Sequence, residues 1–152
     1  MSTPRFVFRH VWPVPAPVGV VTAALADIEH YPRWWPQVRS VARIDDVSGR
    51  GRIRSLLPVT LDLVLTREIE DREGGRLRVA LGGDLLGWAG WSVVPDPAGT
   101  ATGSIATFEQ EVRVAARLDR AATLAPFVLR ANHAWMMRQG RRGLARELTP
   151  RR

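Results

Sequence analysis

The sequence of 152 residues contains no cysteine and no lysine, and none of its apolar runs is long enough for a membrane span. The missing cysteines exclude disulfide bonds, thiolate metal ligands and a cysteine nucleophile. A membrane-spanning helix is not expected, because it needs about 18 or more consecutive apolar residues. The first ten residues lack the apolar core and cleavage site of a signal peptide. We therefore expect a cytoplasmic protein that forms a single domain over residues 1–152.

Positive charge is supplied by arginine alone, with 22 arginines and a formal net charge of +7. Ten arginines and only two acidic residues lie between Val112 and Arg152, whereas the rest of the chain is close to neutral. A biased genome composition explains an excess of arginine without any partner. The local concentration also fits peripheral contact of a C-terminal helix with an anionic membrane. The same charge would attract RNA, although nucleic acid is not the partner that we expect.

The pattern of apolar residues predicts an α+β fold. A β-branched and aromatic run predicts a strand over 6–14, and helical spacing predicts two short helices, over 17–27 and around 32–35. Alternation with a period of two then predicts six strands, over 38–46, 51–57, 60–72, 76–81, 86–94 and 101–117. The links between these strands are short and rich in Gly, Pro and Asp, which indicates antiparallel neighbours. The last element is a helix over 123–148.

The strand over 60–72 shows how the sheet is covered. Its leucines at 61, 63 and 65 share one face with Ile69, while Thr60, Asp62, Thr66, Glu68 and Glu70 share the other. A sheet with one apolar face must bury that face, and the last helix would be about 40 Å long, enough to cross it. We therefore predict a seven-stranded curved antiparallel sheet wrapped around the C-terminal helix, with a pocket between them.

Several segments occur in a characteristic order. They are Pro15-Ala16-Pro17, Tyr31-Pro32-Arg33-Trp34-Trp35-Pro36, the turn Gly83-Asp84-Leu85-Leu86-Gly87 followed by Trp91, and Asn132-His133, Met136-Met137, Gly140 and Gly143-Leu144 in the last helix. Over nearly its whole length the chain resembles the START-like, or helix-grip, superfamily (SRPBCC), in its polyketide cyclase/dehydrase-like branch. The resemblance implies an internal cavity for a hydrophobic or amphipathic small molecule. It does not define the chemistry, because this superfamily includes both enzymes and lipid carriers.

Arg67 is the most unusual candidate residue, because it lies on the apolar face of its strand between Leu65 and Ile69. A buried guanidinium without a partner is costly, so it must reach a counter-charge or water. One interpretation is a cation that binds a carboxylate, phosphate or enolate of the ligand. The alternative is an arginine near a strand end that extends to solvent. Arg54 is a weaker candidate of the same kind.

His133 lies in the middle of the last helix, near Met137 and Leu144. It is a candidate general acid or base, or a polar anchor for a ligand, and the alternative is a structural histidine between helix and sheet. His10 and His30 are weaker candidates. The three histidines show no metal-binding spacing, and the chain has no phosphate-binding or dinucleotide-binding glycine motif. We expect neither a metal nor a cofactor.

Two tryptophan pairs add candidates for the pocket wall. Trp34 and Trp35 are adjacent, so we expect one to line the pocket, taken as Trp35, and the other to point outward. Trp88 and Trp91 lie three apart on one strand, so only one of them faces inward. Including Leu61, which we also expect in the pocket wall, the residues predicted to contact the ligand are Trp35, Arg54, Leu61, Leu63, Leu65, Arg67, Trp88, Phe108, His133 and Met137.

Three functional hypotheses follow. The first is a protein that binds a lipid, polyketide or similar hydrophobic metabolite without altering it. The second is a cyclase or dehydratase that uses the same pocket, with His133 or Arg67 stabilising developing charge. The third is contact of the arginine-rich C-terminal helix with RNA or anionic lipid. The first two differ in whether several polar groups meet at one point in the cavity.

Overall fold

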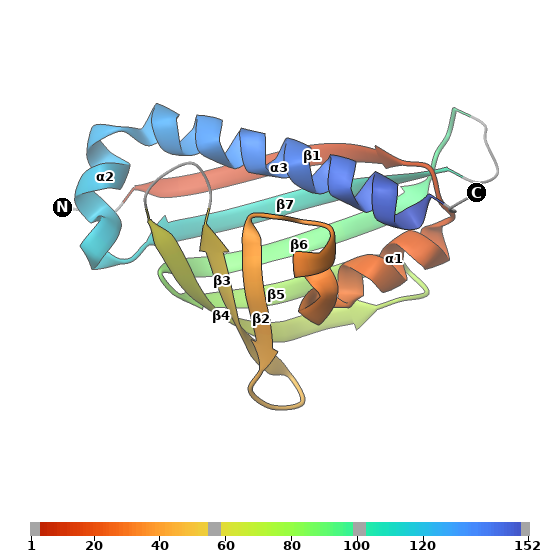
Figure 1. The fold of residues 1–152 in the computed structure, drawn as a ribbon, viewed down its shortest axis with the longest axis horizontal. Coiled ribbons are helices and arrows are strands. Elements are labelled where there is room, and N and C mark those ends of the chain that lie inside the picture. The colour runs from red at the N-terminus through yellow and green to blue at the C-terminus, as the bar shows by residue number, and fades with distance from the viewer. Residues whose placement is uncertain (1–3, 55–58, 99–102, 150–152) are drawn as a thin grey trace.

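The computed structural model describes residues 4–54, 59–98 and 103–149, and the strands form one seven-stranded antiparallel sheet. The strands are β1 (Arg5–Val14), β2 (Val38–Arg43), β3 (Ser48–Arg54), β4 (Thr60–Asp71), β5 (Arg76–Gly83), β6 (Leu85–Pro95) and β7 (Ser104–Val114). Their order across the sheet is β1-β7-β6-β5-β4-β3-β2, which places the first strand beside the last (Figure 1). All neighbouring strands are antiparallel, as the short links predict.

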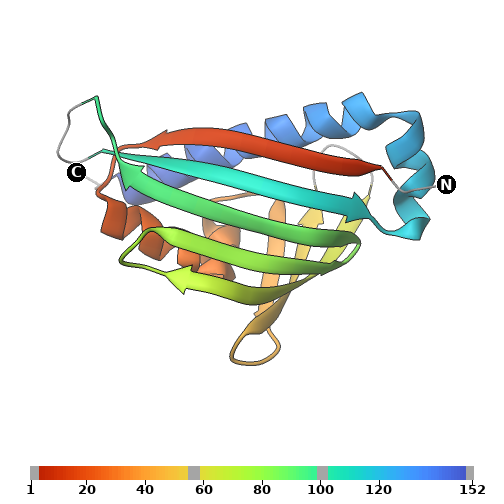
Figure 2. The ribbon, with the colours of Figure 1, turned by 180° about the vertical axis from the view of Figure 1, so that it is seen from behind.

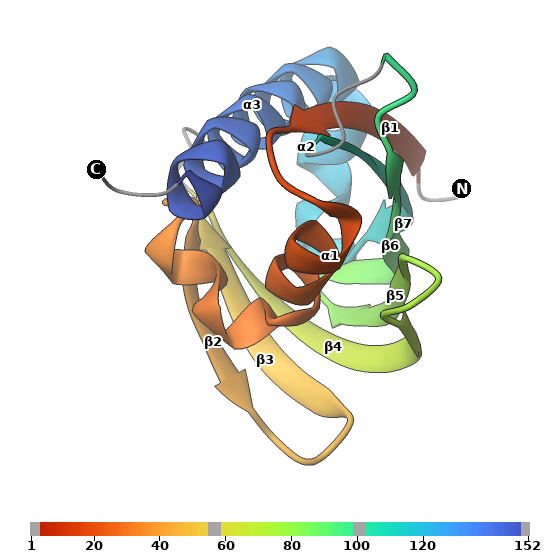
Figure 3. The same cartoon turned by 90° about the vertical axis from the view of Figure 1, so that its right-hand side faces the viewer.

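The helices lie within the curve of the sheet. They are α1 (Val18–Ala26), α2 (Asp119–Leu124) and α3 (Pro126–Leu148), with the 3-10 helices η1 (Ile28–Arg33) and η2 (Ala116–Leu118). The sheet curls around α1 and α3, so the predicted fold class is confirmed (Figure 3). Seen from behind, the described helices leave the middle strands uncovered on the convex face (Figure 2).

The predicted boundaries differ from the structure mainly at the C-terminal end. The strand predicted over 101–117 ends at Val114, and a helical turn begins at Ala116. The helix predicted over 123–148 is divided, because Ala125, which precedes Pro126, leaves the helical conformation with φ −139° and ψ 54°. Pro126 then opens α3 at a position where no helical hydrogen bond is lost. The predicted strand residues 55–57 and 101–102 lie outside the described residues.

Two glycines allow α3 to approach the segment that follows η1. A Cβ atom on Gly143 would lie 1.6 Å from the carbonyl oxygen of Trp34, and one on Gly140 would lie 2.5 Å from the ring of Trp35. The indole nitrogen of Trp35 donates a hydrogen bond to the carbonyl of Met136 at 3.0 Å. The close approach and this hydrogen bond fix one end of α3 over the concave face of the sheet.

The turn between β5 and β6 is held in place by a glycine that allows a close backbone contact and by the hydrogen bonds of one carboxylate. Gly83 has φ +84°, and a Cβ there would lie 2.4 Å from the carbonyl oxygen of Asp62. The carboxylate of Asp84 accepts hydrogen bonds from the backbone N–H of Asp62 at 2.8 Å and from Arg117 at 2.8 and 2.6 Å. Asp84 therefore joins β4, the β5–β6 turn and the segment that leads into α2.

Candidate ligand cavity

A cavity of about 890 Å³ lies between the concave face of the sheet, α1 and α3. This volume falls in the range of pockets that enclose small-molecule ligands, roughly 300–1,000 Å³. Its wall is mostly aliphatic and aromatic, with contributions from every strand and from both long helices; examples are Leu61, Leu63, Leu81, Trp91, Phe108 and Val112. The alternation seen in β4 explains this composition, since one face of each strand is directed at the cavity.

Most of the residues predicted to contact a ligand lie in the wall. The structure places Trp35, Leu61, Leu63, Leu65, Arg67, Phe108, His133 and Met137 there. Arg54 is an exception: Ile53 faces the cavity, so the next side chain of β3 points to solvent. Trp88 is a second exception, because it lies outside the wall with the Arg78 guanidinium 4.2 Å from its ring centre. Trp91 is the inward member of that pair and packs against Phe108.

Trp34 does not point outward, contrary to expectation. Both Trp34 and Trp35 are 6% exposed, and their rings stack at 5.5 Å with an interplanar angle of 20°. Neither helix nor strand alternation applies here, because Trp34 leaves η1 with φ −125° and ψ −12°. Trp35 lines the cavity, while the Trp34 carbonyl meets α3 at Gly143.

A polar pair, Gln110 and His133, lies inside the cavity wall. His133 comes from α3 and Gln110 from β7, and their side chains meet at 2.8 Å between His133 Nε2 and Gln110 Oε1. The His133 ring stacks on Phe8 with ring centres 3.7 Å apart, and it lies 5.2 Å from the His10 ring. Two polar groups therefore meet at one point of a wall that is mostly apolar.

His133 is held in its neutral form. Burial, together with the smaller effects of the nearby His10 and Arg130 charges, lowers the pKa of His133 from an ordinary value of 6.5 to about 3. Burial also lowers the pKa of His10. At neutral pH the His133 ring therefore carries one proton and no charge. A proton acceptor with so low a pKa is a weak general base, and the neutral ring is a weak acid.

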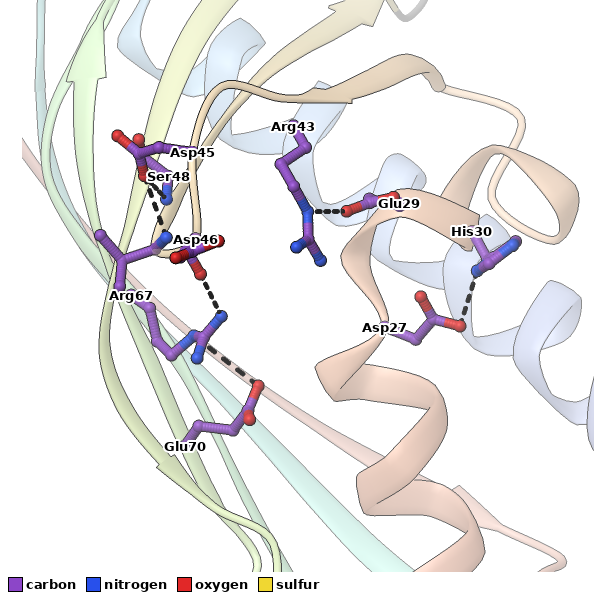
Figure 4. A network of polar contacts seen from close by, with 10 residues as sticks. Asp27, Glu29, His30, Arg43, Asp45, Asp46, Ser48, Arg67 and Glu70 are labelled. Carbon is purple, nitrogen blue, oxygen red and sulfur yellow. Dashed lines mark hydrogen bonds and ion pairs between the residues drawn. The ribbon is translucent and has the colours of Figure 1, made fainter.

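Charged residues surround one mouth of the cavity, where α1 and η1 face the β2–β3 hairpin and β4 (Figure 4). Arg67 lies in this rim with its side chain 44% exposed. It donates to the carbonyl of Asp46 at 2.8 Å and lies 3.8 Å from the carboxylate of Glu70. Across the mouth, Arg43 donates to Glu29 at 2.9 Å. The structure thus places Arg67 at the surface, as in the solvent-reaching interpretation.

The position of Glu70 corrects the simple alternation expected for β4. The register between β4 and β5 shifts between Arg67 and Ile69, so that Glu70 is paired with Leu77. Leu77 faces the cavity, and Glu70 lines it on the same side. An extra residue in one strand reverses the faces that follow it. The irregularity brings Glu70 towards Arg67, whereas strict alternation would have separated them.

Gln110 is a polar residue of the cavity wall that was not predicted from the sequence. It is 8% exposed, and it shares the buried face of β7 with Phe108 and Val112. The signal was present, because a glutamine between inward-facing apolar residues is the same anomaly that singled out Arg67. Among the described residues, no three acidic or histidine side chains are grouped as metal ligands. None of the described helices is long and apolar enough to cross a membrane.

Comparisons with known proteins agree with this geometry. Residues 5–149 match the family model described as polyketide cyclase/dehydrase and lipid transport. The Zhui aromatase/cyclase from Streptomyces sp. R1128 superposes with a TM-score of 0.77 at 14% identity, covering 95% of this chain and 93% of that one. A START superfamily protein from Mycobacterium smegmatis gives 0.73 at 18% identity, covering 94% and 99%. At these identities the structures show a shared fold. No curated protein matches the sequence.

Proposed function

Because the chain belongs to the polyketide cyclase/dehydrase and lipid transport family, we propose that its cavity binds a hydrophobic or amphipathic small molecule, such as a lipid or polyketide, and releases it unaltered. The observation that carries the proposal is the cavity of about 890 Å³ with its largely apolar wall. Apolar surface removed from water contributes about 25 cal/mol per Å² to association, so such a wall favours an apolar guest.

The polar groups of the cavity support binding more than catalysis. A cyclase or dehydratase would need a group that exchanges protons near neutral pH. The pKa of His133 is lowered to about 3, and its partner Gln110 does not titrate. Arg67 lies at the charged rim and is engaged by Asp46 and Glu70. These features favour a pocket that orients a ligand and leaves its covalent bonds unchanged.

The test is a substitution that places a large side chain in the cavity from one residue of its wall. Ala89 lies on β6 and lines the cavity, so Ala89→Trp would project an indole into the space. Ala80, on neighbouring β5, is paired with Trp88 and lies outside the wall, so Ala80→Trp is a matched control. The probe is N-phenyl-1-naphthylamine, an uncharged dye that fluoresces strongly in apolar surroundings.

We expect wild type and Ala80→Trp to bind the dye equally, and Ala89→Trp to bind it about tenfold more weakly, which corresponds to about 1.4 kcal/mol. Circular dichroism would show that both variants are folded. Equal binding by all three proteins would place the dye outside the cavity and contradict the proposal. If Ala89→Trp weakens dye binding as expected, native mass spectrometry of the protein from its own host would identify the natural ligand and show whether it is altered.

A second candidate function is contact with an anionic membrane through the outer face of α3. Phe127 is 72% exposed, and Ala131 and Trp135 follow it at intervals of four residues on the same face. Arg138 and Arg142 continue this face towards the C-terminus. An exposed aromatic residue such as Phe127, followed by the half-buried Trp135 and by arginines, is typical of helices that lie in a membrane interface.

This second candidate predicts co-sedimentation with vesicles that contain phosphatidylserine and not with pure phosphatidylcholine vesicles. Phe127→Ala should weaken the binding, whereas Ile44→Ala, which removes an apolar side chain that is 54% exposed beyond β2, should not. Binding that survives about 0.5 M salt without loss would contradict an electrostatic mode.

A further inference from the structure

The hydrogen bond between His133 and Gln110 has a defined direction. His133 is neutral, so only one of its ring nitrogens carries a proton. Its Nδ1 atom is buried and has no hydrogen-bond partner among the described residues. A buried N–H without an acceptor is rarely tolerated, whereas an acceptor with a spare lone pair is tolerated more often. The proton therefore lies on Nε2, which donates to Gln110 Oε1 at 2.8 Å.

This direction orients the amide of Gln110. Since Oε1 receives the His133 proton, the amide nitrogen is the group left for another partner. Gln110 lines the cavity, and within the part of the chain that the structure describes its amide nitrogen makes no hydrogen bond. This nitrogen is not among the described buried atoms that lack a partner, so it is open to the cavity, where an acceptor on the ligand can reach it.

We propose that the ligand carries an uncharged carbonyl oxygen, and that this oxygen accepts a hydrogen bond from the Gln110 amide nitrogen. The inference rests on the proposed function and names the chemical class of the ligand. His133 is a positioning residue in this arrangement, because it holds the amide with its N–H group towards the cavity. The remainder of the ligand lies against the apolar wall.

A carboxylate is disfavoured at this point, because none of the arginines in the described wall is free. Arg130, whose charge lowers the pKa of His133, lies outside the wall over the rings of Phe6 and Phe8. The arginines that line the cavity are engaged elsewhere: Arg43 with Glu29, Arg67 and Arg72 with Glu70, and Arg78 over Trp88. A buried carboxylate without a counter-charge would pay a large desolvation cost. An alcohol also offers an oxygen, but its hydroxyl hydrogen would need a further acceptor.

The test uses four probes with one carbon skeleton: fluorene, 9-fluorenone, 9-hydroxyfluorene and fluorene-9-carboxylate. Equilibrium dialysis gives the dissociation constant of each for the full chain. The readout is the ratio of the fluorene constant to the fluorenone constant, compared between proteins. The different hydration of the two probes cancels in that comparison, since it is the same for every variant.

The main variant is Gln110→Leu combined with His133→Phe. Replacing both partners of a hydrogen bond with apolar groups of similar shape is close to neutral for stability, and phenylalanine retains the stacking on Phe8. We expect the fluorenone preference to fall about fivefold in this variant, while fluorene binds at least as well as before. In wild type we expect fluorenone to bind most tightly and the carboxylate most weakly.

His133→Phe alone tests the positioning role. With the His133 N–H removed, the Gln110 amide can turn either edge to the cavity, so the preference for ketone over alcohol should relax while fluorene binding is kept. An unchanged fluorene-to-fluorenone ratio in the double variant, or a carboxylate that binds as tightly as the ketone, overturns the carbonyl assignment. If fluorene binds but the fluorene-to-fluorenone ratio does not change in the double variant, the carbonyl assignment is wrong and the proposed ligand-binding function is retained. If none of the probes binds, both proposals are contradicted.

Discussion

The neutral histidine buried in the cavity wall makes folding sensitive to mild acid. In the folded chain the pKa of His133 is about 3, whereas in the unfolded chain it returns to its ordinary value of 6.5. Above pH 6.5 both states carry a neutral ring, and the group contributes nothing to the pH dependence of stability. As the pH falls below 6.5, the His133 ring takes up a proton in the unfolded chain but not in the folded chain. Stability is therefore lost on the acid side of 6.5, until the folded ring is protonated near pH 3.

The size of this loss follows from the two pKa values. One pKa unit corresponds to about 1.4 kcal/mol, so His133 should lower the free energy of unfolding by about 2 kcal/mol between pH 7.5 and pH 5. This interval lies above the range in which most carboxylates titrate, which separates the histidine from the acidic residues. His10, whose pKa burial also lowers, adds a loss of the same sign.

The assay is urea denaturation followed by tryptophan fluorescence at both pH values. His133→Phe should be less stable at pH 7.5, because Gln110 loses its partner. Its further loss on going to pH 5 should be about 2 kcal/mol smaller than that of wild type. Gln110→Leu is the matched control: it removes the same hydrogen bond and keeps the titrating ring, so it should retain the wild-type loss. An identical pH dependence in wild type and His133→Phe would refute the reasoning.

Three further predictions concern the packing that forms the cavity. Gly143→Ala should destabilise the protein by about 3 kcal/mol in urea denaturation, because the new Cβ would collide with the Trp34 carbonyl. Gly19→Ala in α1, where a Cβ meets no atom within 4 Å, should instead be neutral or stabilising by roughly 0.5 kcal/mol; a loss there would contradict the packing argument. Asp84→Asn should cost about 1–3 kcal/mol, because the ion pair with Arg117 is lost, and an unchanged urea midpoint would count against that contact.

Regular alternation is the reason why the fold could be predicted in such detail. A period of two identified six of the seven strands, and the short turns between them indicated antiparallel neighbours. The period also placed Leu61, Leu63 and Phe108 on the side that became the cavity wall. Irregular backbone defeated the same reasoning: the turn at Trp34 buries both tryptophans, and the register shift after Arg67 turns Glu70 towards the cavity.

The sequence by itself determined which faces are apolar, and hence a curved sheet closed by a long helix around a space for a ligand. Only the tertiary structure decided which polar groups enter that space. Gln110 and His133 lie 23 positions apart in the chain, and no periodicity relates a strand residue to a helix residue across the core. Their meeting depends on how closely α3 approaches the sheet, and that distance is set by packing at Gly140 and Gly143. Arg67 is a similar case, since the local pattern left open both an interior cation and an arginine that extends to solvent, and the structure places its side chain 44% exposed at the rim (Figure 4).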